Sequence, residues 1–200
     1  MAYPCQVALS SAAMNIRRVV LTVAALLAML LPAFAQQQRL SPHETISTVI
    51  DGNRVTIVYG RPYAKHPKTG EERKIWGSLV PYGKIWRTGA DEATLLITQK
   101  TITLGALTVP AGAYTLWTLP TADGATLIVN KQIGQWGLGR EQKQYYDEAN
   151  DLGRLELKKE ALATPVAQFT IAVTSNSPAG GGLFKMSWEG LAFSAPIAVK

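Results

Sequence analysis

The regular alternation of apolar and polar residues near the C-terminus constrains the fold of this chain more than any other feature. Apolar side chains occupy every second position over residues 169–173, 184–188 and 191–199. Successive side chains of a β-strand point to opposite faces, so this period gives each segment one apolar face and one mostly polar or small face. The pattern predicts half-buried antiparallel strands.

Turn-forming residue pairs separate the predicted strands. Asp51-Gly52 lies between residues 45–50 and 54–59, Asp123-Gly124 between 114–119 and 126–130, and Glu189-Gly190 between the last two predicted strands. The first two pairs tolerate the positive φ angles of tight hairpins, and we interpret the third as a turn of the same kind. Pro196 has no N–H to donate, which predicts that the last strand is an edge strand or is bulged there.

These signals predict an all-β fold, an antiparallel β-sandwich or a jelly-roll-like barrel, with a long aromatic and basic loop. Only residues 140–152 suggest a helix. That segment is polar on all sides, which favours a short surface helix or a long loop over a core helix. The fold class therefore allows at most one short helix.

Residues 14–35 have the three parts of a cleavable signal peptide. Arg17 and Arg18 form a basic start, residues 19–31 are almost wholly apolar, and Ala33-Phe34-Ala35 supplies a cleavage site. The apolar run is shorter than the roughly 20 residues that span a bilayer. We expect residues 1–13 to be a mis-assigned N-terminal extension, with Met14 as the true start. The predicted location is the periplasm or the cell exterior.

Residues 36–200 are the predicted mature chain, and their length suits a single domain. They lack cysteine, because the only one is Cys5, and this excludes disulfides, thiol catalysis and cysteine-bound zinc. Removing residues 1–35 lowers the formal charge from +6 to +4, since it removes Arg17 and Arg18 and no acidic residue. No cluster of lysine and arginine indicates a nucleic-acid partner.

Residues 59–94 do not read as regular strand. The segment is long, rich in glycine and proline, and carries tryptophan, tyrosine, arginine and lysine. Loops of this length in a domain are usually functional or disordered. Large aromatic side chains gain free energy by burial, so we expect a folded loop packed across the sheet.

Several phrases in and around this segment resemble the exported bacterial family DUF2911. They are Ser41-Pro-His-Glu-Thr45, Tyr59-Gly-Arg-Pro62, the run from Lys74 to Thr94 and Pro110-Ala-Gly-Ala-Tyr114. The resemblance spans nearly all of the predicted mature chain and implies an exported, β-rich protein with no established activity. It carries no known site residues. Asp91 stands where the family more often has asparagine, and residues 64–72 look like an insertion.

The predicted ligand-binding residues combine aromatic rings with charged groups. They are Arg61, Trp76, Tyr82, Trp86, Arg87, Asp91 and Glu92, with His43, Glu44, Lys131 and Trp136 in second rank. Aromatic faces stack on sugar rings and arginine binds carboxylates through two hydrogen bonds, which suits a small molecule or a glycan. Alternatively, the tryptophans fill the core, and Arg87 pairs with Asp91 or Glu92 as a structural link.

No metal, cofactor or catalytic residue is predicted. His43 and His66 lie far apart and show no metal-ligand spacing with Glu44, Asp91 or Glu92. The sequence has no nucleophile elbow, phosphate-binding loop or dinucleotide fingerprint.

Three functions remain open from the sequence. A non-enzymatic binding module of the cell envelope is preferred over a hydrolase acting on envelope glycans and over a structural or assembly protein. The hydrolase requires two carboxylates, or a histidine and a carboxylate, that converge in a cleft. No nucleic acid and no membrane span in the mature chain are expected, and the sequence specifies neither the ligand nor the oligomeric state.

Overall fold

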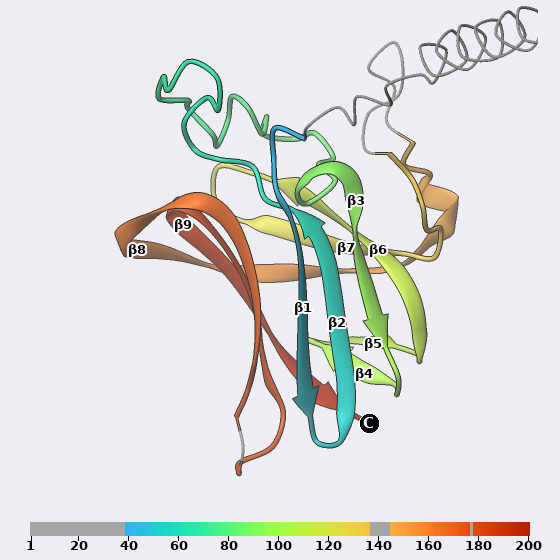
Figure 1. Cartoon of the computed structure of the whole chain (residues 1–200). Coiled ribbons are helices and arrows are strands. Elements are labelled where there is room, and N and C mark those ends of the chain that lie inside the picture. The colour runs from blue at the N-terminus through green and yellow to red at the C-terminus, as the bar shows by residue number, and fades with distance from the viewer. Residues whose placement is uncertain (1–38, 137–144, 177) are drawn as a thin grey trace, which may run out of the picture. The chain divides into compact units, whose positions relative to one another are not determined.

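The computed structural model describes residues 39–136, 145–176 and 178–200 (Figure 1). Its strands are β1 (His43–Ile50), β2 (Asn53–Gly60), β3 (Ala90–Thr98), β4 (Ile102–Leu104), β5 (Leu107–Val109), β6 (Gly112–Pro120), β7 (Ala125–Asn130), β8 (Asp151–Ser175) and β9 (Gly182–Val199). The regular helix in these ranges is a single 3-10 turn, η2 (Glu148–Asn150). The prediction of an all-β fold is confirmed.

The strands form one antiparallel sheet that turns back on itself through β8. Its order is β1-β2-β3-β6-β7-β8-β9-β4-β5. The first part of β8, residues 151–157, pairs with β7, whereas residues 158–175 pair with β9. The Thr48 hydroxyl of β1 donates to the Val173 carbonyl of β8 at 2.7 Å, which brings the first strand against the second half of β8. This arrangement fits a sandwich or an open barrel.

The two predicted Asp-Gly hairpins are confirmed. Ile50 pairs with Asn53, which leaves Asp51 and Gly52 as a two-residue turn with φ angles of 46° and 70°. Positive φ at both positions is the type I′ geometry that matches the twist of paired strands. Asp123-Gly124 likewise lies in the loop that joins β6 and β7.

The predicted turn at Glu189-Gly190 is wrong, because β9 runs without interruption from Gly182 to Val199. Glu189 has a φ of 49° and faces a register shift at Val166 of β8. A positive φ within a paired strand produces a bulge, and the two long strands bend together there.

The expectation for Pro196 is correct only locally. As a whole, β9 lies inside the sheet between β8 and β4. Its pairing with β8 ends at Ser194, however, and the Pro196 carbonyl accepts from the Gly105 N–H at 2.8 Å. Pro196 therefore lies in a part of β9 that no longer pairs with β8, so its missing N–H removes no hydrogen bond from that pairing.

Of the segment 140–152, expected to be a short surface helix or a long loop, residues 140–144 lie outside the described ranges. Its described part contains the three-residue turn η2 and the first residues of β8. There Asp147 caps η2 by accepting from the Ala149 N–H, and β8 begins at Asp151. The Asn130 side chain donates to the Asp147 carbonyl and to the Asp151 carboxylate, which fixes this turn against β7. Within the described ranges, no helix has the length and apolarity needed to cross a membrane.

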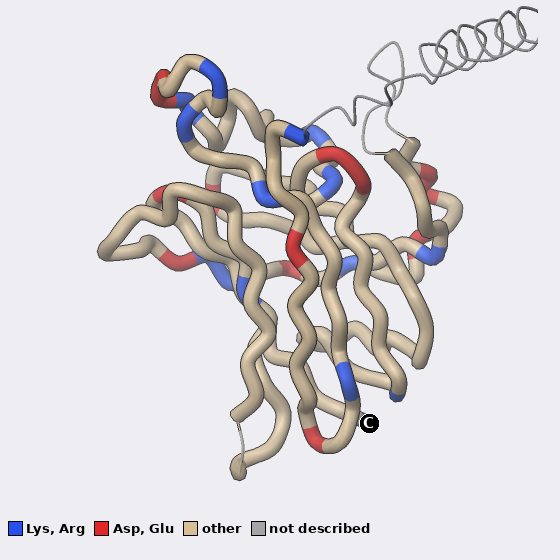
Figure 2. Tube along the Cα trace, viewed as in Figure 1, with Lys and Arg blue, Asp and Glu red and all other residues tan. Residues whose placement is uncertain are grey.

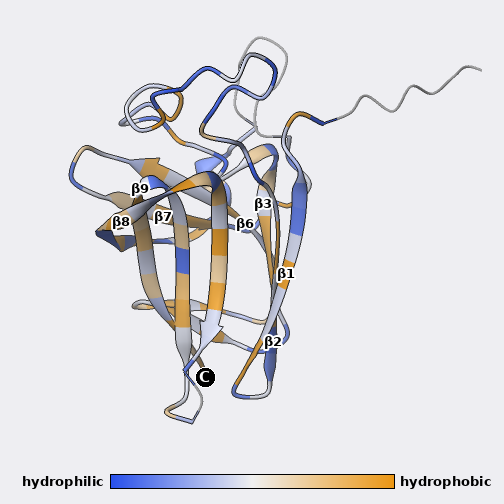
Figure 3. Cartoon of the chain, turned by 60° about the vertical axis from the view of Figure 1, so that its left-hand side comes forward, coloured by the Kyte–Doolittle hydropathy of each residue, from blue (hydrophilic) through white to orange (hydrophobic). Residues whose placement is uncertain are grey.

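One hydrophobic core joins both parts of the sheet. It includes Ile57, Leu116 and Leu127 from β2, β6 and β7, and Phe169, Phe184 and Trp188 from β8 and β9. The alternating apolar residues at 169–173 and 184–188 are buried, as their period predicts. Figure 3 shows the hydrophobic positions concentrated on the strands and mostly hydrophilic residues on the loop between β2 and β3.

Candidate functional site

The connection between β2 and β3 is a folded loop of residues 61–89, shorter than the predicted 59–94 because Tyr59 and Thr94 belong to strands. Trp86 exchanges both backbone hydrogen bonds with Thr118 of β6, each at 2.8 Å. Tyr63 forms a bridge with Gln168 of β8. The loop is thus attached to both halves of the curved sheet, at the end where β1 begins and β2 ends (Figure 1).

The two loop tryptophans close this end of the core. Trp76 is 8% exposed, and its indole N–H donates to the Trp188 carbonyl. The Trp86 ring stacks on Trp188, with centroids 6.0 Å apart, and contacts Phe169 edge-on. Tyr82, in contrast, is 42% exposed. The three predicted aromatic residues therefore do not form one exposed stacking surface, and the alternative of core packing describes Trp76 better.

A cavity of about 770 Å³ lies between the loop and the start of β3. Its wall also includes Leu40 and Ser41, and Trp188 closes it from β9. Arg73, Lys84 and Arg87 line it together with His66, whereas Asp91 is the one carboxylate among its described lining residues. Figure 2 shows several lysine and arginine residues on this loop, whereas the strands below it carry few charged residues.

Arg87 is, together with Trp188, one of the two described lining residues whose buried side-chain nitrogen has no hydrogen-bond partner. Its Nε is buried and has no hydrogen-bond partner. Burial lowers the pKa of the Arg87 guanidinium, and the charge of nearby Asp91 partly opposes that effect. The expected ion pair with Asp91 or Glu92 is not formed, because both carboxylates contact Arg39 and His43 instead. Among the residues that the structure describes, no carboxylate forms an ion pair with this guanidinium in the cavity wall.

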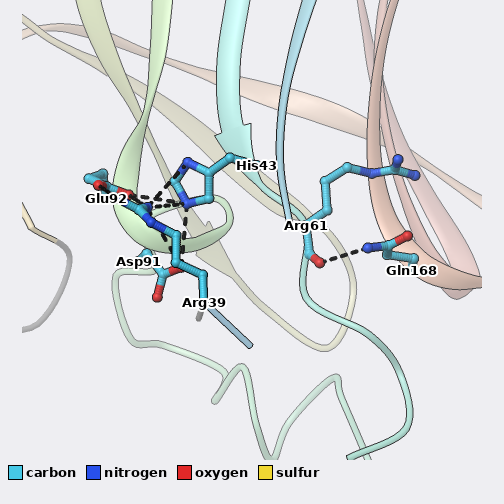
Figure 4. Close-up of polar contacts among 6 residues, drawn as sticks. All are labelled: Arg39, His43, Arg61, Asp91, Glu92 and Gln168. Carbon is cyan, nitrogen blue, oxygen red and sulfur yellow. Dashed lines mark hydrogen bonds and ion pairs between the residues drawn. The ribbon is translucent and has the colours of Figure 1, made fainter. Parts of the chain in front are cut away.

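Beside the cavity, four charged or titratable side chains form what we call the His43 cluster: Arg39, His43, Asp91 and Glu92 (Figure 4). Asp91 has a φ of 63° at the start of β3, and this turn presents Asp91 and Glu92 to the start of β1. His43 Nε2 lies 3.3 Å from Asp91 Oδ2 and 3.1 Å from Glu92 Oε2. Arg39 donates to both Glu92 oxygens, at 2.5 and 2.6 Å, and this pairing lowers the pKa of Glu92.

Arg61 and Glu44 take part in a separate network that joins β1, β2 and β8. Arg61 pairs with Glu44 at 3.1 Å and donates to the Phe169 carbonyl and to Thr170 Oγ1. Glu44 also accepts from the Tyr59 hydroxyl. Figure 4 shows the Arg61 side chain directed away from the His43 cluster, so the structure assigns this predicted site residue a bonding role between strands.

The remaining second-rank residues differ in their position. Trp136 is 47% exposed, lies 5.8 Å from the Arg39 guanidinium carbon and bridges with Glu92, so it borders the His43 cluster. Lys131 is exposed and uses its backbone N–H to bond the Asn150 carbonyl. His66, which was not among the predicted binding residues, lines the cavity and is not one of the clustered side chains.

Two residues at this end were not selected from the sequence. Arg39 precedes β1 by four positions, and Arg73 directly follows residues 64–72, the segment interpreted as an insertion. Arg73 donates to the carbonyls of Ala64 and Tyr63, which holds it at the cavity wall. No local signal marks either residue, because each acquires its role from a segment that only folding brings near.

A family model described as "Protein of unknown function (DUF2911)" matches residues 41–197 of the chain. No curated protein and no solved structure matches the chain. The matched range contains the whole loop, the cationic residues of the cavity and three members of the His43 cluster, whereas Arg39 precedes it.

Proposed function

Since the chain belongs to DUF2911, a family of unknown function, we propose that it is an exported, non-enzymatic binding protein for a small anionic molecule, in particular an acidic sugar. The proposed binding site is the cavity beside the loop of residues 61–89. Export rests on the signal-peptide pattern of residues 14–35.

The buried, unpartnered Nε of Arg87 is the observation that carries this proposal. A buried donor without an acceptor costs about 1–3 kcal/mol, more when the group is charged. A ligand carboxylate would supply the missing acceptor, and a guanidinium can hold it through two parallel hydrogen bonds. Arg73 and Lys84 on the same wall add positive charge, against the carboxylate of Asp91.

The size and lining of the cavity support a ligand of sugar size. Its volume of about 770 Å³ lies within the roughly 300–1,000 Å³ of small-molecule pockets. Trp86, Pro62 and Ile85 supply apolar surface beside the cationic groups. A sugar acid has both an apolar ring face and a carboxylate, so it complements the two kinds of surface.

Calorimetric titration of the mature chain with glucuronate and with glucose tests the proposal. We expect glucuronate to bind and glucose to bind at least tenfold more weakly, because only the acid offers an acceptor to Arg87. Arg87→Gln should weaken glucuronate binding by tenfold or more, and Lys84→Gln by a smaller factor. Arg54→Gln, at the far end of β2, is the matched control.

Equal binding of glucose and glucuronate would contradict the proposal, as would unchanged affinity in both Arg87→Gln and Lys84→Gln. Lys84 is exposed, so its variant keeps the test decisive if the partly buried Arg87 variant unfolds. A wider panel of simple anions, including galacturonate, acetate and phosphate, follows. The absence of binding to every member would reject an anionic ligand.

One observation favours hydrolysis as a second candidate. His43 Nε2 lies 3.3 Å from Asp91, which also lines the cavity, and a histidine beside a carboxylate is a common acid–base pair. It ranks second because Arg39 already contacts both His43 and Glu92. Release of nitrophenol from nitrophenyl glucuronide that is abolished by His43→Gln and kept by Arg54→Gln would place hydrolysis first.

A further inference from the structure

Three metal-ligating atoms converge beside the cavity. A ring nitrogen of His43, a carboxylate oxygen of Asp91 and a carboxylate oxygen of Glu92 all lie within 4.8 Å of one another. They come from the starts of β1 and β3, two strands that flank β2 in the sheet. Their convergence depends on the positive φ of Asp91, which turns two consecutive carboxylates toward the histidine.

The two separations between His43 Nε2 and the carboxylate oxygens match the edges of a coordination polyhedron. Zinc–nitrogen and zinc–oxygen bonds of about 2.0–2.1 Å place neighbouring ligand atoms about 3.0–3.4 Å apart in octahedral or tetrahedral geometry. His43 Nε2 lies 3.3 Å from Asp91 Oδ2 and 3.1 Å from Glu92 Oε2. One ion can therefore contact the histidine and either carboxylate without a rearrangement of the backbone.

A positive charge already lies among these three side chains. Arg39 Nη1 is 2.5 Å from Glu92 Oε2, 2.7 Å from His43 Nε2 and 3.9 Å from Asp91 Oδ2. A guanidinium has donors and no acceptor, and Nε2 of His43 lies between this donor group and the Asp91 and Glu92 carboxylates, at 3.3 and 3.1 Å. A neutral imidazole with a free lone pair is the form that binds metal ions. The three side chains thus surround a cationic nitrogen, at the place where a metal ion would lie.

We infer that His43, Asp91 and Glu92 form a binding site for a divalent transition-metal ion, with Zn²⁺ and Mn²⁺ as the best candidates, and that Arg39 competes with the metal for it. One imidazole and two carboxylates suit these ions, and the two negative charges balance the ion. Calcium and magnesium prefer sites made of oxygen atoms alone, so they should bind more weakly. The inference does not depend on the anionic ligand of the cavity.

Arg39 can leave the cluster at low cost. Its side chain is 45% exposed, and the residue lies before the start of β1. The guanidinium contacts the Trp136 ring as well as Glu92. Exposed ion pairs are weak, so the Arg39–Glu92 pair opposes the metal by a small factor only. Removing Arg39 should therefore raise the affinity for the metal about twofold to fivefold. A structural role of the cluster alone predicts no such gain.

The test is titration of the full mature chain with Co²⁺, a spectroscopic substitute for Zn²⁺, followed by its visible absorption, and with Zn²⁺ by calorimetry, in both cases without any added anion. We expect His43→Gln and Glu92→Gln each to weaken binding at least tenfold, and Arg39→Gln to tighten it. Glu156→Gln, on exposed β8 surface, and Arg54→Gln are the matched controls. Circular dichroism checks that each variant is folded.

The inference is overturned if neither the wild type nor Arg39→Gln binds Co²⁺ or Zn²⁺ more tightly than His43→Gln does. It is also overturned if Arg39→Gln weakens binding, since Arg39 would then not compete. Failure here leaves the Arg87 test of the cavity untouched, because that test uses an anion and no metal.

Discussion

At the scale of single residues, Tyr59 connects the candidate site to the core. Its hydroxyl donates to Glu44 at 2.8 Å and accepts from the buried Ile171 N–H at 2.9 Å. Burial, assisted by the Glu44 carboxylate, raises the pKa of Tyr59 to about 12. One hydroxyl therefore joins β2 to β1 and to β8, as part of the network that holds Arg61.

Tyr59→Phe should lower the free energy of unfolding at pH 7 by about 1–3 kcal/mol, because the Ile171 N–H loses its acceptor in a buried place. The folded state favours the neutral phenol, so its contribution is complete below pH 10 and is lost as the pH rises through 12. Urea unfolding at several pH values measures both effects.

Between pH 10 and 12, the free energy of unfolding of Tyr59→Phe should fall by less than that of the wild type. Tyr82→Phe is the control, since Tyr82 is 42% exposed and should change neither quantity. If the two variants behave alike, Tyr59 does not anchor β8 in this way.

At the scale of elements, the close approach of β2 and β3 decides how the loop begins and ends. Gly60 pairs with Ala90 after a register shift, and a Cβ added to Gly60 would lie 2.2 Å from the Ala90 carbonyl oxygen. That distance is too short for any side chain. The two strands can meet only because Gly60 has none, and the cavity and the His43 cluster both lie beside this junction.

Gly60→Ala should therefore cost about 1–3 kcal/mol of stability through overpacking, and it should also weaken ligand binding in the cavity. Thermal unfolding and glucuronate titration measure the two consequences. Gly124→Ala, in the β6–β7 loop, adds a methyl group with nothing within 4 Å and serves as the control. Equal melting temperatures for the two variants would contradict this account of the junction.

At the scale of the whole described unit, Arg39–Lys200, stability depends on two long strands shared by both parts of the sheet. Phe169 of β8 and Trp188 of β9 contact each other and Trp86 of the loop. The predicted mature chain has no cysteine, so packing has to replace covalent cross-links.

We expect a single cooperative unfolding transition, with the same midpoint by tryptophan fluorescence and by far-ultraviolet circular dichroism. Phe169→Ala should lower stability by about 3–5 kcal/mol and shift both signals together, because it opens a void in the shared core. A reducing agent should change neither midpoint. Separate transitions for the two signals would show that the halves of the sheet unfold independently.

Part of this protein is determined by local sequence. Alternation with a period of two specifies strands wherever it occurs, and Asp51-Gly52 specifies a hairpin, because both effects depend on adjacent residues alone. The phrases around 74–94 identified the family for the same reason. Glu189-Gly190 was misread because a local pattern does not distinguish a turn from a bulge in a continuous strand. That distinction depends on whether β8 bends alongside.

The candidate site, by contrast, was decided by tertiary structure. The sequence selected Arg87, Asp91 and His43 and left open whether Trp76 is buried, but it gave no sign that Arg39 meets Glu92, 53 positions away. The exposure of a side chain depends on which other segments pack against it. Distant side chains meet only if the order of strands in the sheet places the ends of their strands together. The local pattern of residues therefore determined the strands and the family, and only the curved sheet determined the cationic cavity and the cluster of possible metal ligands.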